Sequence, residues 1–196
     1  MTQYAAIAPR IIRESSRGFD ICNIQDEMLA NREIELVGEI DADMINMLIR
    51  ELRHLQRQDA EAEITIFINS PGGQVSSGLA LYDVMQAISC PIRTVCLGLA
   101  ASMGALIFIA GDKRQILPHS RLMIHDPLIT SAGGSALSMK AISDDLMRTR
   151  DVTAEIIAKH SALSLEEVLE LTAKDTFLGA DKALELGMAD SIIESI

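Results

Sequence analysis

The sequence predicts an α/β fold built as a single domain. Runs rich in β-branched and aliphatic residues alternate with segments whose apolar residues recur at helical spacing. A repeating order of strand, strand and helix is typical of α/β proteins. The 196 residues can enclose one substantial core, and no repeat, low-complexity tract or linker divides them.

The first part of the chain is expected to begin with an irregular arm over residues 1–20. Helical spacing follows at 24–29, and the residues at 33–37 indicate a short strand that ends at Gly38. Asp41 is a favourable N-cap for the amphipathic helix that comes next.

The rest of the chain continues this alternation. A nearly continuous apolar run at 64–68 predicts a strand buried on both faces, and the Asn-Ser-Pro-Gly-Gly sequence at 69–73 is a strong turn signal. A helix over 76–88 and a strand over 92–97 follow. The remaining expected elements are two strands, a long amphipathic helix, a short helix that starts with a capping box, a last helix and a closing strand, over 114–117, 121–124, about 134–160, 164–167 onward, 180–186 and 190–196. The long helix is polar over much of its surface, which favours its projecting from the domain to meet another subunit.

Composition excludes several function classes. A net charge of −11 and a pI near 4.7 argue against nucleic acid, because phosphate binding requires clustered lysine and arginine. No apolar run reaches the roughly 18 residues that span a bilayer, so no membrane contact is expected. Residues 1–8 carry neither a basic leader nor an apolar signal core, which predicts no export. Three cysteines without CxxC spacing fit reduced thiols in a cytoplasmic protein, with Cys96 in the core.

Ser102 is the candidate nucleophile. It lies among small residues at 98–105, after a strand-like run and before an apolar, helix-competent one. Small neighbours permit a sharp strand-to-helix turn that exposes the serine Oγ, and a helix start offers free N–H groups to a developing oxyanion. The alternative is a serine that only caps a buried helix, since serine is a favoured N-cap.

A base and an acid for Ser102 are available elsewhere in the chain. His125 lies at the end of an apolar strand, where its imidazole can be held rigidly and accept the serine proton. Asp126 is adjacent, but successive strand side chains point to opposite faces, so it is not expected to orient the same ring. Asp175 lies in a loop before a Phe-Leu pair, where a carboxylate can be held against the core. Spacing alone does not establish that these residues meet.

Gly72 and Gly73 follow a buried strand and allow the backbone to approach a ligand closely. We expect this loop to donate one oxyanion hydrogen bond and the Met103 N–H, directly after the nucleophile, to donate the other. The alternative is an ordinary glycine turn.

No cofactor is expected on this chain. His119 and His125 stand six residues apart without an HExxH motif or a Cys/His array, which disfavours a metal site. The sequence has no GxxxxGKS/T phosphate loop, so the chain is not expected to hydrolyse ATP.

Five sequence blocks, in order, carry a specific resemblance. They are Phe-Ile-Asn-Ser-Pro-Gly-Gly at 67–73, Tyr-Asp-Val-Met-Gln at 82–86, Ala-Ala-Ser-Met-Gly-Ala at 100–105, Ser-Arg-Leu-Met-Ile-His-Asp-Pro at 120–127 and Asp-Thr-Phe-Leu at 175–178. With them the chain resembles the ClpP family, the proteolytic subunits of ATP-dependent Clp proteases, over residues 9–193.

By this resemblance Ser102 is the nucleophile, His125 the base and Asp175 the orienting acid. The oxyanion donors fall on Gly73 and Met103. The resemblance implies a serine endopeptidase that degrades unfolded polypeptides and small peptides. It implies no cofactor, because the partner unfoldase, and not this chain, uses ATP.

The resemblance also implies a crotonase-like fold of stacked strand–strand–helix units over 1–196, with a handle region at about 128–160. Heptameric rings stacked into a tetradecamer are expected to hide the active sites in a chamber. A AAA+ unfoldase of the Clp type is expected to feed unfolded chains into it.

The chain departs from the family pattern at positions expected to contact the ATPase or the other ring. Cys22 and Gln25 stand where the family has two aromatic residues that shape the ATPase-docking region, which predicts altered docking. Ala173 and Lys174 replace an Asp-Arg pair, so the inter-ring ion pair of that motif cannot form. Asp126 stands where Gln or Glu is usual. These departures predict a divergent paralogue.

Two other functions stay open on the sequence. The first is a non-standard or regulatory ring subunit that combines with an active ClpP paralogue, which the changed assembly residues favour and the retained triad disfavours. The second is a crotonase-like acyl-CoA enzyme, which shares the fold but does not need the set of Ser102, His125 and Asp175.

Overall fold

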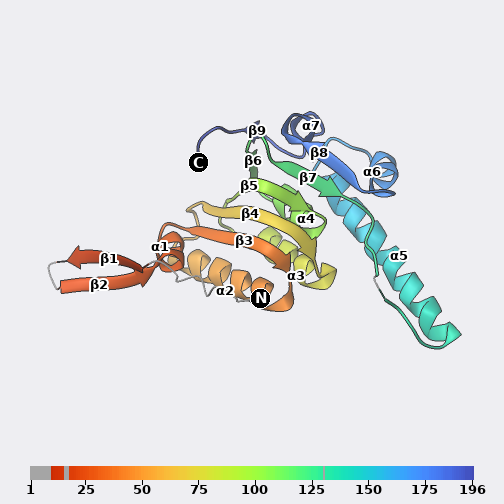
Figure 1. The fold of residues 1–196 in the computed structure, drawn as a ribbon, viewed down its shortest axis with the longest axis horizontal. Helices are drawn as coiled ribbons and strands as arrows, with labels where there is room; N and C mark the ends of the chain where they lie inside the picture. Colours follow the sequence, from red (N-terminus) through yellow and green to blue (C-terminus); the bar gives the residue numbers. More distant parts are fainter. Residues whose placement is uncertain (1–9, 16–17, 130) are drawn as a thin grey trace, which may run out of the picture.

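A computed structural model describes residues 10–15, 18–129 and 131–196 of the chain (Figure 1). The described residues form a central sheet of seven strands, a separate two-stranded hairpin and seven helices, which confirms the predicted α/β class. The strands are β1 (Arg10–Ser15), β2 (Gly18–Asn23), β3 (Glu33–Ile40), β4 (Ile64–Gly73), β5 (Ile92–Ala101), β6 (Lys113–Ile116), β7 (Arg121–Ile124), β8 (Thr176–Gly179) and β9 (Ser191–Ile192). The helices are α1 (Ile24–Ala30), α2 (Ala42–Gln58), α3 (Val75–Ala87), α4 (Met103–Ile109), α5 (Ala136–Lys159), α6 (Leu165–Thr172) and α7 (Ala180–Glu185).

Strand β5 is central to the sheet because different neighbours border its two halves. On one side it pairs with β4; on the other it pairs with β6 over 93–96 and with β7 over 99–101. All these pairs are parallel, whereas β8 is antiparallel to β7. The sheet therefore divides along β5, and β7 borders the end of β5 that leads into α4 (Figure 1).

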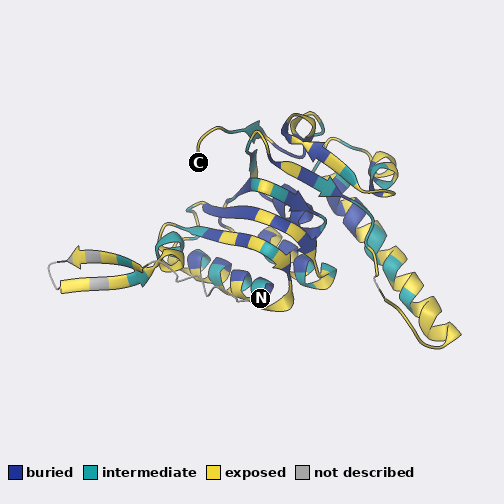
Figure 2. Cartoon of the chain, viewed as in Figure 1, coloured by how far each residue is buried: buried dark blue, intermediate teal, exposed yellow. Residues whose placement is uncertain are grey.

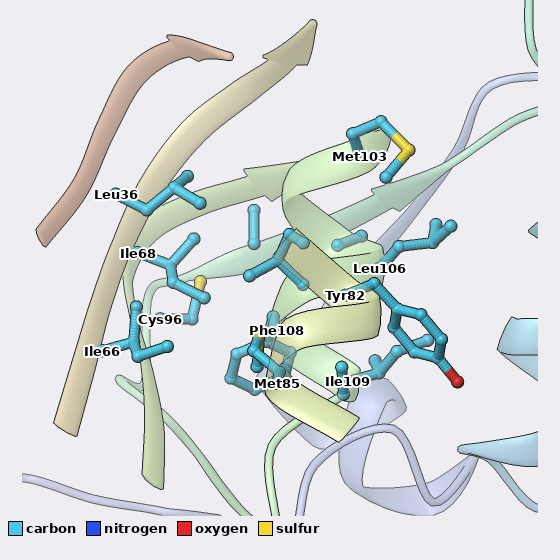
Figure 3. Close-up of a cluster of buried hydrophobic side chains, with 14 of the residues drawn as sticks. Leu36, Ile66, Ile68, Tyr82, Met85, Cys96, Met103, Leu106, Phe108 and Ile109 are labelled. Carbon is cyan, nitrogen blue, oxygen red and sulfur yellow. The ribbon is translucent and has the colours of Figure 1, made fainter. Parts of the chain in front are cut away.

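Helices α2, α3 and α4 cover one face of the sheet and enclose the main core (Figures 1 and 2). Helix α4 is buried along its whole length, between β4 and β5 on one side and α3 on the other. Its Phe108 lies in a cluster with Met85 of α3, Ile66 and Ile68 of β4 and Cys96 of β5 (Figure 3). The apolar sequence after the candidate nucleophile is therefore an interior helix that anchors the strand-to-helix junction.

Residues 69–73 continue β4 and do not form the predicted turn. They pair with the end of β3, which likewise continues past Gly38, its predicted stop. Ser70 Oγ joins the two strands there: it donates to Gly38 O at 2.6 Å and accepts from Gly72 N–H at 3.1 Å. Positive φ values of 96° at Gly38 and 92° at Gly72 permit these irregularities. The turn-forming residues thus kink both strands without ending their pairing.

The prediction of an irregular arm over 1–20 is wrong for its described part. Strands β1 and β2 pair antiparallel as a hairpin, with Ile12 opposite Ile21, and the hairpin extends away from the sheet (Figure 1). Both of these isoleucines are exposed, and no hairpin residue whose burial is described is buried, so the sequence there shows no clear apolar alternation. Residues 1–9 and 16–17 of the predicted arm lie outside the described residues.

Several local predictions are confirmed. Asp41 accepts a hydrogen bond from Met44 N–H at 2.8 Å and caps α2, and Ser164 with Glu167 forms the capping box of α6. Two strand lengths were wrong. Strand β5 runs to Ala101 because its end pairs with β7, and the closing strand over 190–196 is only the two-residue β9.

The long helix predicted at about 134–160 is α5, which projects from the body of the domain (Figure 1). Exposed residues dominate its first turns, whereas Thr153, Ala154, Ile156 and Ile157 near its end are buried (Figure 2). The helix is therefore held at one end only within a single chain. That its free part meets another subunit stays a prediction.

A polar cluster joins the held end of α5 to α3. Lys159 Nζ donates to Tyr82 Oη at 3.2 Å, which leaves the tyrosine O–H to donate to His160 Nε2 at 3.1 Å. Burial, and then the positive charges of Lys159 and Arg114, lower the pKa of His160, against a smaller opposing effect of Asp112. The cluster therefore favours a neutral His160.

This cluster predicts a pH-dependent loss of stability. As the pH falls through about 6.5, the unfolded chain binds a proton at His160 before the folded chain does, so the free energy of unfolding decreases. We expect His160→Gln to reduce this decrease between about pH 7 and 5 in denaturation experiments. His54→Gln, at an exposed position of α2, controls for the loss of a histidine. Identical pH profiles for wild type and His160→Gln contradict the prediction.

Candidate active site

Ser102 lies at the junction of β5 and α4. Its φ of 53° and ψ of −123° fall outside the regions that residues other than glycine favour, so the backbone is strained there. Its N–H donates to Met123 O of β7 at 2.8 Å, which fixes the junction against the neighbouring strand. Its side chain makes no capping hydrogen bond to α4 and contacts His125 instead. The geometry therefore does not favour the alternative of a simple helix cap.

The three residues selected from separate segments meet in one hydrogen-bonded line. Ser102 Oγ lies 2.9 Å from His125 Nε2, and His125 Nδ1 lies 3.2 Å from Asp175 Oδ1. His125 directly follows β7, whose last residue, Ile124, pairs with Thr176 at the start of β8. Asp175 precedes Thr176, so the antiparallel pairing of β7 and β8 brings the carboxylate beside the imidazole.

The two ends of this line differ in exposure. The His125 side chain is 14% exposed, whereas the Asp175 side chain is 67% exposed. The expectation that Asp175 is held against the core is therefore wrong for the single chain. Its turn is fixed through the next residue, because Thr176 Oγ1 donates to Leu171 O at 2.7 Å. Water weakens an exposed ion pair, so anything that covers Asp175 strengthens its hold on His125.

Gly72 lies directly against the candidate nucleophile. A Cβ at this position would come within 2.7 Å of Ser102 Cβ and 3.2 Å of Met103 N, so only glycine fits. Gly73 is one residue further along β4, where a Cβ would collide with the backbone of Ile40. The structure thus brings the glycine pair to the site, and Gly72 is the member in closest contact. The oxyanion roles of Gly73 and Met103 stay predictions.

A narrow pocket lies beside Ser102, next to a larger groove. The pocket has both polar and apolar walls and is lined by Val75, Ser102, Met103, Leu106, His125, Pro127 and Thr153. The groove encloses about 760 Å³ between the start of α3, the segment after β7 and the projecting part of α5. Val75 and Pro127 line both, so the pocket and the groove are neighbours.

Cys96 does not compete with Ser102 as a nucleophile. Burial raises the pKa of its thiol to about 12, so the thiol stays protonated at neutral pH. This confirms its expected place in the core. Within the described ranges, no group of three or more His, Cys, Asp or Glu side chains could hold a metal ion. None of the helices in the described part of the chain is long and apolar enough to cross a membrane.

Helix α5 brings two residues to the site that were not predicted from the sequence. Thr153 lines the pocket beside Ser102, and Arg150 binds the carboxylate of Asp126. Asp126 was correctly expected not to orient the His125 ring. A signal for the missed residues is present, because polar residues interrupt the apolar stripe of the long helix where it meets the core.

A comparison with protein families assigns the chain to one of them. The family model described as Clp protease matches residues 16–196, which include the junction at Ser102, the strand before His125 and the turn at Asp175. The match extends over most of the chain and through the whole central sheet. The chain therefore belongs to the ClpP family of Clp proteases.

Proposed function

We propose that this chain is a serine endopeptidase whose nucleophile is Ser102, whose general base is His125 and whose orienting acid is Asp175. The observation that carries the proposal is the line of contacts from Ser102 Oγ through His125 to Asp175, at 2.9 and 3.2 Å. Serine attacks a peptide only when a base removes its proton, and a neutral imidazole held in place by a carboxylate does this near neutral pH.

The reaction follows from these contacts in two stages. His125 Nε2 takes the proton of Ser102 Oγ as the oxygen attacks the substrate carbonyl carbon, and Asp175 stabilises the imidazolium. The N–H groups of Met103 and Gly73 stabilise the oxyanion of the tetrahedral intermediate. Imidazolium then protonates the leaving amine, which leaves an ester on Ser102. Water hydrolyses this ester by the same sequence of proton transfers and regenerates the serine.

The shape of the site supports an extended peptide as substrate. The groove beside the site is lined mainly by apolar side chains of α3, of α5 and of the segment after β7. The narrow pocket at Ser102 accepts at most part of one side chain beside the scissile bond. Peptides and unfolded polypeptides reach such a groove, whereas the folded surface of another protein does not enter it. We therefore propose unfolded chains and small peptides as substrates.

The proposed assembly is a pair of stacked heptameric rings that encloses the active sites and receives substrate from a AAA+ unfoldase of the Clp type. Proteins of the ClpP family generally form rings and work with Clp ATPases. The projecting α5, with exposed Leu137, Met139 and Met147, supports a further contact between subunits. Sequestration fits a peptidase of low specificity, since it keeps folded proteins away from the nucleophile.

A second candidate is a regulatory or non-standard ring subunit that works with an active ClpP paralogue. The exposure of Asp175 favours it, because the catalytic carboxylate is not shielded within the single chain. Ala173 and Lys174, which replace the family's Asp-Arg pair, lie directly before Asp175. Activity of the purified chain distinguishes the two candidates.

The first prediction concerns the nucleophile. A fluorophosphonate probe is expected to label Ser102 of the assembled protein, and peptide mapping locates the adduct. Ser102→Ala is expected to abolish labelling, and His125→Ala to lower its rate at least about 1,000-fold, because the serine then keeps its proton. An assembled wild-type ring that takes up no probe contradicts the peptidase proposal and favours the regulatory one.

The second prediction concerns Gly72. Gly72→Ala is expected to lower the labelling rate about 100-fold, because the added methyl group displaces Ser102 and Met103 from their catalytic positions. Gly133→Ala is the matched control, since a Cβ there would meet nothing within 4 Å. Equal labelling rates for the two variants would remove Gly72 from the site.

The third prediction concerns the unfoldase. Gln25 lines a pocket of about 210 Å³ whose walls combine apolar side chains, such as Met28 and Leu29, with acidic ones, such as Glu51; Cys22 lies shortly before Gln25 in the chain. Because this chain lacks the two aromatic residues of the family pattern, we expect it to bind a standard Clp ATPase weakly. The double variant Cys22→Tyr/Gln25→Tyr is expected to bind at least about tenfold more tightly, as aromatic side chains dominate such contacts. Ordinary family affinity of the wild type contradicts this prediction.

A further inference from the structure

We propose that Arg150 is a positioning residue, which holds the catalytic His125 in place through an ion pair with Asp126. The inference rests on the proposed peptidase function. It assigns a role to a residue of the handle helix that makes no contact with the nucleophile.

Asp126 is fixed from two sides. Its carboxylate accepts a hydrogen bond from Arg150 Nε of α5, with Oδ2 and Nε 2.7 Å apart. Its backbone N–H donates to Thr172 O, the last residue of α6, also at 2.7 Å. The residue after the base is thus tied to both helices, and one of them leads directly into the turn that carries Asp175.

Without the contacts of Asp126, strand pairing would hold the backbone of His125 only on its N-terminal side. Strand β7 ends at Ile124, so the pairing with β5 and β8 constrains only the preceding residues. Asp126 and Pro127 begin the irregular segment that leads to α5. The contacts of Asp126 therefore fix the backbone beyond the end of β7, at His125 and Asp126, and so help to position the imidazole.

Arg150 is itself well placed for this task. It belongs to the held end of α5, where Thr153 donates to Arg150 O at 3.0 Å and also lines the pocket beside Ser102. The side chains of Arg150 and Asp126 are 25% and 33% exposed, so their pair is partly shielded from water. An exposed pair contributes little to stability, but a partly buried, directional one can fix geometry.

The orientation of the Arg150–Asp126 ion pair also explains why Asp175, and not Asp126, contacts the His125 ring. Adjacent side chains of an extended segment point to opposite sides. His125 therefore faces Ser102 and Asp175, while Asp126 faces α5. The two carboxylates have different partners: Asp175 contacts the His125 ring, and Asp126 pairs with Arg150 and so holds the backbone next to His125.

The test measures kcat and KM for a fluorogenic peptide with the assembled full chain and its variants. Arg150→Met is expected to lower kcat about 10- to 100-fold with little change in KM, because the base is displaced while the groove is retained. Arg150→Lys keeps a cation and is expected to recover most of the loss. Asp126→Asn, which removes the other charge, is expected to resemble Arg150→Met, and the double variant to be no worse than either single one.

Arg148→Met is the matched control. Arg148 is an exposed arginine two residues away on the same helix, so its loss removes the same charge without touching Asp126. We expect wild-type kcat for this variant. Native mass spectrometry of each variant verifies that it assembles into rings. If Arg150→Met does not assemble, the kcat of Asp126→Asn provides the test instead.

The outcomes separate the two proposals. A wild type that neither cleaves peptide nor takes up the probe overturns the peptidase function. An active wild type with Arg150→Met and Asp126→Asn at wild-type kcat overturns the positioning role and leaves the function intact. A fall in kcat that Arg150→Lys does not relieve, or that Arg148→Met shares, also overturns it.

Discussion

Strand β7 pairs with β5 on one side and β8 on the other, and the candidate site depends on this double pairing. The β5 pairing places the end of β7 beside the junction at Ser102, whose N–H donates to Met123 O. The β8 pairing places the turn at Asp175 beside His125. Both rest on backbone hydrogen bonds between short strands, so a shift of one residue in either register would separate the triad. The interior helix α4 and the sheet oppose such a shift, since they bury the junction on its other side.

The strained backbone of Ser102 is held in place by the same strand pairing and helix packing. A serine at φ 53° is less stable than one in a regular strand or helix, and such strain persists only where the surroundings impose it. Here the surroundings are the buried α4, the pairing with β7 and the close approach of Gly72. The result is an Oγ that faces the imidazole and makes no bond to its own helix. The packing of the core thus maintains the strained backbone that directs Ser102 Oγ at His125.

The sequence predicted the site better than it predicted the details of the fold around it. Ser102, His125 and Asp175 were selected by residue type and local context, together with the resemblance to the ClpP family, and the structure brings all three together. The turn expected at 69–73 failed because glycine, proline and serine also permit kinked strands, and the partner strand has a matching irregularity. The hairpin near the N-terminus was missed because none of its residues with described burial is buried, so no apolar alternation marks its strands. Arg150 was missed because the polar interruption of the long helix marks its position but does not identify Asp126, 24 residues away, as its partner.

The central claim is that Ser102 and His125 act together on a peptide carbonyl, and a peptidyl chloromethyl ketone tests it most directly. Such a reagent binds as a substrate, reacts with a nucleophilic serine at its carbonyl and alkylates the nearby histidine. Mass spectrometry of the digested adduct should locate the alkyl group on His125, and Ser102→Ala should greatly slow its attachment. Alkylation of Cys22 alone, or of His125 at the same rate without Ser102, would contradict the account.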